Sequence, residues 1–215
     1  MKLEALWRPQ SDVRAPDARV EQEMTSMDAK PAKLQQHWMY VLGGTGLREK
    51  ARKWEERKTR QGKGYAVIDC APAGSHAPRL AGVGNDDVLY VFADAVREGR
   101  VGEWEMGPED LARHLRAEGL DLGHRSLKIF ASHSGDGFGS ECFAERVYEA
   151  MRPEYPHMMV SGYRGQVDAE GFDGHKTAGL SEGETLEGLS REQWLEKGAR
   201  AMENRVQFPP QPEGE

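Results

Sequence analysis

The sequence has few of the features that mark a secreted or membrane-spanning protein. Its 215 residues include two cysteines, Cys70 and Cys142, which form neither a disulfide framework nor a metal-binding pattern. No apolar run approaches the roughly 20 residues that a membrane span needs, and the first residues lack the apolar core of a signal peptide. We therefore predict a cytoplasmic protein with reduced thiols, or one exported by a secretion system that needs no cleaved signal.

Hydrophobic side chains are also scarce, at 38% of the chain, and the net charge is −7. The negative charge argues against wholesale binding of nucleic acid. A hydrophobic fraction this low suffices for one core if the polar ends of the chain stay outside it. We predict a flexible arm at residues 1–35, a single domain at residues 36–206 and a flexible tail at residues 207–215.

Short apolar runs alternate with helical patterns along the predicted domain. The runs predict five strands, at Trp38–Leu42, Gly64–Cys70, Val88–Phe92, Leu127–Ala131 and His157–Ser161. Apolar residues at helical spacing predict helices at about residues 47–60, 108–119, 140–151 and 190–205, with Ser140 as a cap of the third. Because the apolar runs are continuous, the sequence predicts an α/β fold with a mostly parallel sheet and helices on both faces.

The chain becomes small and polar directly after the fourth predicted strand. The turn contains Ser132, His133 and Ser134, followed by Gly135, Asp136 and Gly137. Open α/β folds place their sites at the carboxyl ends of parallel strands. We therefore expect a site at this turn.

A second Gly-rich turn, Gly43-Gly44-Thr45-Gly46, follows the first predicted strand. It is similar to the opening of a dinucleotide-binding turn, in which phosphate rests on backbone N–H groups at a helix N-terminus. The third small residue of that fingerprint is missing, so a plain tight turn without a cofactor is the preferred interpretation. The helix that follows is strongly basic and includes Arg48 and Arg52, which makes it a candidate surface for a small anionic ligand.

Five segments between Trp38 and about Gly165 carry a recognisable set of motifs: Asp87–Val91, Pro108–Leu115, Leu127–Ser132, Phe143–Arg146 and Val160–Gly165. Together they resemble the self-cleaving cysteine-peptidase domains of RTX-type bacterial toxins, which have a caspase-like fold. In that family the third strand precedes the catalytic His, and the fourth strand ends in the catalytic Cys. An inositol polyphosphate activates the family's domains through basic residues, which implies a similar anionic ligand at the basic helix here.

The two catalytic positions of the family are substituted in this sequence. The turn after the third strand carries Asp94 and no His, and the Cys position falls on Ser132. A carboxylate is too weak a base to activate a serine hydroxyl, whereas imidazole readily generates a thiolate. We therefore predict a non-catalytic, peptidase-like binding or effector module of a bacterium. Its former active-site cleft, lined by Asp94, Ser132, His133 and Ser134, would hold a peptide or protein partner.

Three alternatives would restore chemistry to the chain. Ser134 could act as the nucleophile of a serine hydrolase, with partners that the sequence offers as Asp168 or Asp173 and His175. Cys142 could act as a peptidase nucleophile, because it lies near a helix N-terminus and His133 is close in sequence. A metal could bind a set drawn from His133, Asp136, His175, Asp173 and Asp94. These residues lack the tight spacing of metal ligands, so we predict no metal.

Overall fold

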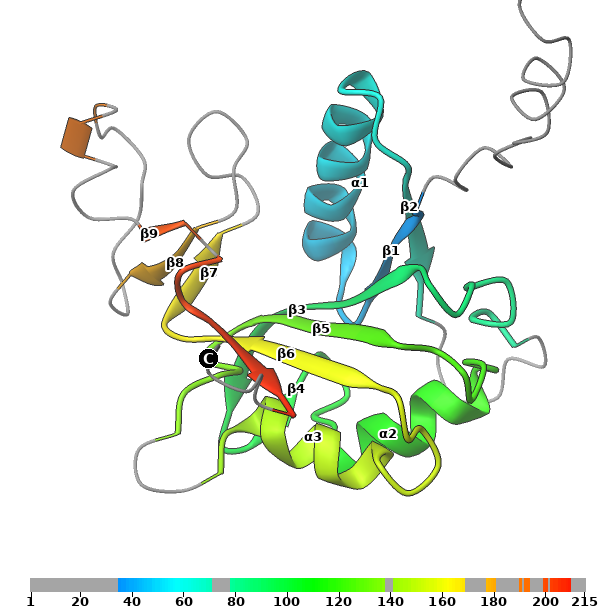
Figure 1. The fold of residues 1–215 in the computed structure, drawn as a ribbon. Coiled ribbons are helices and arrows are strands. Elements are labelled where there is room, and N and C mark those ends of the chain that lie inside the picture. The colour runs from blue at the N-terminus through cyan, green and yellow to red at the C-terminus, as the bar shows by residue number, and fades with distance from the viewer. Residues whose placement is uncertain are drawn as a thin grey trace, which may run out of the picture. The chain divides into compact units, whose positions relative to one another are not determined.

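A twisted sheet with a parallel centre organises the fold (Figure 1). The computed structural model describes residues 35–70, 78–137, 141–168, 177–180, 190, 192–193, 199–200 and 202–209. In this part of the chain the main sheet has seven strands in the order β10-β6-β5-β3-β1-β2, with β4 paired to the end of β3. The strands are β1 (His37–Val41), β2 (Tyr65–Asp69), β3 (Val88–Arg97), β4 (Arg100–Val101), β5 (Ser126–Ser132), β6 (Met159–Tyr163) and β10 (Arg205–Phe208).

Five of these strands run parallel, and β10 and β4 pair antiparallel to their neighbours. The predicted α/β fold with a mostly parallel sheet is therefore confirmed. The apolar runs end up with side chains buried on both faces, as continuous hydrophobic strands should. β3 continues five residues past its predicted end at Phe92 and forms a hairpin with β4, and β6 begins two residues later than predicted.

Helices cover both faces of the sheet, as the sequence predicts. On one face lies α1 (Thr45–Arg60), whose apolar stripe buries Trp54 completely, with its ring centroid 5.0 Å from that of Phe130. On the other face lie α2 (Pro108–Ala117) and α3 (Phe143–Met151), whose buried residues join the larger hydrophobic cluster. Repeats of three and four residues between apolar positions produce these stripes.

The connections reverse direction between β1 and β3. The chain leaves β1 through α1 to reach β2 on one side, and leaves β3 through α2 to reach β5 on the other side. In open α/β sheets such a switch point leaves a crevice beyond the carboxyl ends of the two strands. The fold therefore places a crevice next to the turn after β1.

Side chains protect the outer edge of β2, which pairs only with β1 among the described strands. The Glu55 carboxylate accepts a hydrogen bond from the outward N–H of Val67 at 3.3 Å. The Arg79 guanidinium donates to the outward carbonyl of Asp69. Occupied backbone groups cannot pair with a foreign strand, so these contacts blunt the edge.

The predicted helix at residues 190–205 is wrong over its second half, where the structure has β9 (Ala199–Arg200) and the start of β10. Val206 and Phe208 alternate with polar residues, which suits a strand, and β10 pairs with the otherwise open edge of β6. β10 also extends into the predicted tail, as far as Phe208. A second, three-stranded sheet combines β9 with β7 (Gln166–Asp168) and β8 (Thr177–Leu180). The predicted arm up to residue 34 lies outside the described residues.

Candidate functional site

The turn after β5 is held by hydrogen bonds that use its serine hydroxyls. Ser134 is fully buried, and its Oγ donates to the Ile129 carbonyl at 2.9 Å and accepts from the Tyr163 N–H at 2.9 Å. The Ser134 carbonyl accepts the Ala144 N–H at 2.9 Å, just inside α3. The proton and one acceptor lone pair of the Ser134 hydroxyl are thus engaged with backbone. This geometry is that of a structural serine and does not present a nucleophile.

Two glycines allow the same turn to pack closely against neighbouring elements. A Cβ on Gly162 would lie 2.7 Å from the Ala144 Cβ and 2.8 Å from the Ser134 carbonyl oxygen. A Cβ on Gly135 would lie 2.7 Å from Val206. Such distances are too short for any side chain, so the turn, β6, α3 and β10 fit one another only with glycine at these positions.

Ser132 and His133 face different partners. The Ser132 hydroxyl accepts the Val167 N–H at 3.0 Å, which is its one side-chain hydrogen bond within the described residues. His133 has a positive φ of 64°, and its Nδ1 donates to the Asp136 carboxylate at 2.7 Å. Asp136 in turn accepts the Gly165 N–H at 3.0 Å. His133 and Asp136 therefore form an oriented pair, but the imidazole makes no hydrogen bond with a serine or cysteine among the described residues.

Asp94 lies apart from this turn, on the wall of a cavity of about 650 Å³. The cavity occupies the crevice at the switch point, between the turn after β1 and the β3–β4 hairpin. Its described lining consists of Leu42, Gly43, Gly44, Asp94, Ala95, Arg97, Glu98, Arg100, Gly102, Glu103 and Glu105. Of the four residues predicted to line the former cleft, Asp94 is at the cavity, whereas Ser132, His133 and Ser134 are not.

The Gly43–Gly46 turn contributes Gly43 and Gly44 to the lining of this cavity. However, a Cβ on Gly44 would lie 3.8 Å from the Glu103 carboxylate oxygen, so an acidic group already stands at the N-terminus of α1. A bound phosphate would meet that carboxylate, and like charges at this distance repel. The geometry does not favour nucleotide binding without a movement of Glu103.

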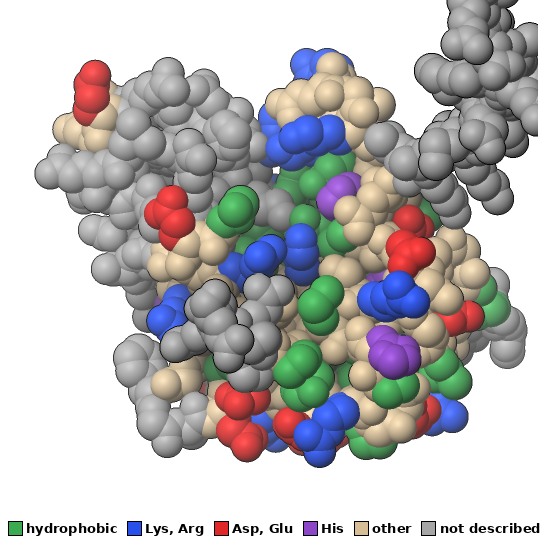
Figure 2. Space-filling view, viewed as in Figure 1, with side chains coloured by type: hydrophobic (Ala, Val, Ile, Leu, Met, Phe, Trp, Pro, Cys, Tyr) green, Lys and Arg blue, Asp and Glu red, His purple; other side chains and the backbone are tan. Residues whose placement is uncertain are grey.

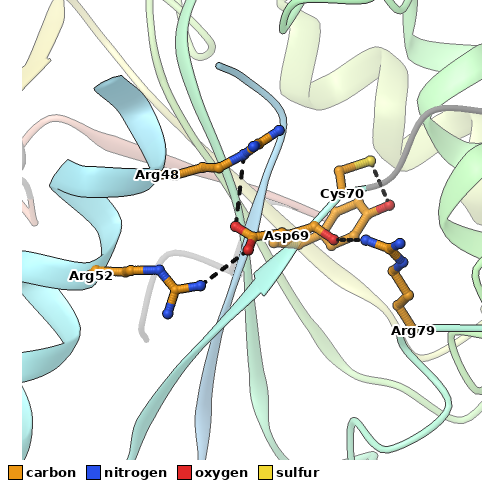
Figure 3. A network of polar contacts seen from close by, with 6 residues as sticks. Arg48, Arg52, Asp69, Cys70 and Arg79 are labelled. Atoms are coloured by element: carbon orange, nitrogen blue, oxygen red, sulfur yellow. Dashed lines mark hydrogen bonds and ion pairs between the residues drawn. The ribbon is translucent and has the colours of Figure 1, made fainter. Parts of the chain in front are cut away.

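Arg48 and Arg52 of α1 face Asp69 at the end of β2 (Figure 3). Arg52 Nη2 lies 3.1 Å from one Asp69 oxygen, and Arg48 Nε lies 3.9 Å from the other. These two predicted anion-binding residues therefore have a carboxylate from their own chain beside them. The pairs are partly exposed, so each contributes well under about 1 kcal/mol to stability.

Cys142 is the N-cap of α3, whereas the predicted cap, Ser140, lies outside the described residues. Its Sγ accepts the Glu145 N–H at 3.4 Å, and the residue is 5% exposed. Burial raises the pKa of the Cys142 thiol, and this effect outweighs the hydrogen bonds that the thiolate would receive. The helix N-terminus therefore does not produce the reactive thiolate that the peptidase alternative requires.

Sequence reasoning missed a buried polar cluster formed by Tyr40, Cys70 and His114. The Tyr40 oxygen lies 2.8 Å from Cys70 Sγ and 2.7 Å from His114 Nε2, and the Cys70 sulfur lies 3.2 Å from the same nitrogen. Figure 3 shows the Cys70 thiol directed at this hydroxyl. The contacts join residues up to 74 positions apart, and the only sequence signal is that His114 falls on the apolar stripe of α2.

The cluster is neutral. Burial raises the pKa of Cys70 to about 12 and lowers the pKa of His114, and burial likewise raises the pKa of Tyr40. The thiol then donates to the Tyr40 oxygen, and the Tyr40 hydroxyl donates to the His114 nitrogen. A catalytic Cys–His pair needs a thiolate beside a charged imidazole, and this arrangement stabilises neither.

Within the described residues, no group of three His, Cys, Asp or Glu side chains is placed to hold a metal ion. His175 and Asp173, from the predicted metal set, lie outside those residues. The described part of the chain also has no helix long and apolar enough to cross a membrane.

No protein-family model matches the chain, and no curated protein matches it in sequence. The likeness to toxin peptidase domains therefore stays a prediction.

Proposed function

We propose that the protein is a non-catalytic, peptidase-like binding module that holds a peptide or protein segment in the cavity beside Asp94. One observation carries this proposal: the cavity at the switch point is open and polar, while the two candidate serines outside it are bonded to backbone. Ser132 meets a backbone N–H where the family places its cysteine, and Asp94 supplies a carboxylate where the family places its imidazole.

The charges of the cavity favour a particular kind of peptide. Its described lining has four carboxylates, from Asp94, Glu98, Glu103 and Glu105, against the guanidinium groups of Arg97 and Arg100. Arg100 is partly occupied, because it donates to the Glu105 carbonyl at 2.9 Å. An excess of negative charge in a partly enclosed site attracts cationic groups. The proposed ligand therefore has a lysine or arginine side chain that reaches Asp94.

Binding to a peptide array, followed by titration of the best peptides, tests the proposal. Asp94→Asn should weaken binding of basic peptides at least about tenfold, the usual cost of losing one charged partner in a site of this kind. The matched control is Glu141→Gln, which neutralises an exposed carboxylate outside the cavity lining. Equal affinities of the wild type and Asp94→Asn for every basic peptide would refute the proposed site.

The competing proposal is an active hydrolase that uses Ser134 or Cys142. Fluorophosphonate and chloromethyl-ketone probes separate the two proposals, since they label nucleophiles and leave structural residues untouched. We expect no labelling of the folded protein. Labelling that disappears in Ser134→Ala or Cys142→Ala would replace the binding-module proposal with an enzymatic one.

The anionic ligand predicted at Arg48 and Arg52 would compete with Asp69, so we propose the carboxyl-terminal half of α1 in their place. Burial, together with the charges of Lys63 and Arg57, lowers the pKa of Lys58, and this crowding of cations favours an anion there. We propose this surface as a secondary contact for an acidic partner. Tripolyphosphate should bind it, and the double change Lys58→Met and Lys63→Met should weaken that binding; unchanged binding would remove the surface from consideration.

A further inference from the structure

A second region of the molecule holds two basic side chains on the same sheet face as α1, at the strands beyond that helix. In Figure 1, α1 stands over β1, β2 and part of β3, and its Trp54 reaches Phe130 of β5. No described helix lies over β6 and β10 on that side. Figure 2 shows basic side chains gathered on this region, below α1. The strand register identifies the residues that share it.

One row across the sheet consists of Tyr90, Lys128, Ser161 and Gln207, which are direct partners on neighbouring strands. Arg205 lies two residues along β10 from Gln207 and therefore on the same face. Lys128 and Arg205 are two strands apart and two residues apart along the strand direction, which amounts to about 12 Å between their Cα atoms. A small molecule that contacts both side chains fits this separation.

Lys128 is held in place by an aromatic residue. Its Nζ lies 3.5 Å from the Tyr90 hydroxyl and 5.2 Å from the centroid of the Tyr90 ring. Neither Lys128 nor Arg205 makes an ion pair with a carboxylate within the described residues, although Lys128 is half-buried. The fold thus positions an amine on the same sheet face as a second cation, with no carboxylate partner for either among the described residues.

We propose that Lys128 is a reactive amine that forms a Schiff base with small aldehydes or ketones carrying an anionic group, and that Arg205 holds this anionic group. The unprotonated Nζ attacks the carbonyl carbon to form a carbinolamine. Loss of the carbonyl oxygen as water, with both amine protons leaving the nitrogen, yields the imine. The Tyr90 hydroxyl accepts a hydrogen bond from Nζ at 3.5 Å and so holds the amine in position for the attack.

The electrostatics of the site support this chemistry. Burial, and secondarily the charge of Arg205, lowers the pKa of Lys128 to about 8. At pH 7.5 such an amine is unprotonated about two hundred times more often than a lysine with the ordinary pKa of about 10.4. Desolvation and a neighbouring cation are the two established ways to activate a lysine nucleophile.

Reductive trapping tests the proposal. The protein is incubated with pyridoxal 5′-phosphate at limiting concentration, reduced with borohydride and mapped by peptide mass spectrometry. We expect Lys128 to be labelled at least about tenfold faster than Lys50, an exposed lysine of α1, with a pH midpoint near 8. Labelling spread evenly over the exposed lysines, or slower at Lys128 than at Lys50, overturns the proposal.

Two further measurements separate the roles of the two cations. Arg205→Met should shift the pH midpoint upward and reduce labelling by pyridoxal 5′-phosphate more than labelling by pyridoxal, which has no phosphate. Arg113→Met, on α2, removes a cation from the opposite face of the sheet and should change neither rate. If Arg205→Met changed neither the pH midpoint nor the preference for pyridoxal 5′-phosphate over pyridoxal, Arg205 would not hold the anion. The same conclusion would follow if Arg113→Met changed both quantities as much as Arg205→Met. Peptide binding beside Asp94 should be the same in Lys128→Met as in the wild type, so the two sites are tested independently.

Discussion

Replacing Ser134 with alanine distinguishes a structural serine from a nucleophile. The hydroxyl is fully buried and makes two hydrogen bonds with backbone, one to the Ile129 carbonyl and one from the Tyr163 N–H. A net contribution of about 1 kcal/mol for each bond, with a further penalty because the Tyr163 N–H loses its partner, gives about 2–4 kcal/mol. We therefore expect Ser134→Ala to lower the free energy of unfolding by that amount.

Urea denaturation followed by tryptophan fluorescence measures this change, with the same slope for both proteins if only stability is affected. Ser132→Ala is the matched control, since its hydroxyl makes one side-chain hydrogen bond, to Val167, within the described residues. The control should lose about 1 kcal/mol. A loss below about 0.5 kcal/mol in Ser134→Ala would refute the structural role, because an exposed catalytic serine can be truncated at little cost.

Three other changes follow from the packing and protonation described above. Gly162→Ala would place a methyl group 2.7 Å from the Ala144 Cβ, so we expect the urea midpoint to fall with a loss of about 1–3 kcal/mol; an unchanged midpoint would contradict the close approach. Burial raises the pKa of Cys70 to about 12, so Ellman's reagent at pH 8 should modify it only as fast as the protein unfolds, and rapid reaction of the folded protein would disprove the neutral cluster. Burial lowers the pKa of His114, so below about pH 6.5 the imidazole takes up a proton more readily in the unfolded chain than in the folded one. The free energy of unfolding should therefore fall between pH 7 and pH 5, and it should fall less steeply in His114→Gln. Identical pH dependences of the two proteins would argue against this titration.

The sequence was a good guide wherever local pattern determines structure. The apolar runs of β1, β3 and β5 and the stripes of α1 and α2 were predicted within a few residues, because continuous burial leaves a continuous hydrophobic signal. The Gly-rich turn after β1 and the polar turn after β5 were both predicted. Their positions follow from the rule that parallel strands end at one edge of the sheet.

Local sequence patterns do not predict contacts between residues that are far apart in the chain. A serine in a polar turn predicts a nucleophile at Ser134, but its hydroxyl is bonded to the N–H of Tyr163, which is 29 residues later. The cluster of Tyr40, Cys70 and His114 escapes prediction for the same reason, because its three residues come from separate parts of the chain. Lys128 was also missed, because a lysine inside a strand gives no sign of which residues will lie across from it.

The end of the domain was mispredicted for a related reason. Trp194, Leu195 and Met202 have helical spacing, yet Met202 is 75% exposed and the described chain beyond it is a strand. The open edge of β6 offers backbone hydrogen bonds that no local pattern reveals, and β10 takes them.

The pairing of β10 with β6 also has a consequence for protein engineering. The chain leaves the sheet at Arg164 and returns at Asn204, and these two residues share a backbone hydrogen bond of 2.9 Å. The segment between them therefore begins and ends at one point of the sheet. Its closure cost grows only slowly with its length, so the sheet places little limit on how long this segment is. A reporter domain inserted here would have its ends already side by side.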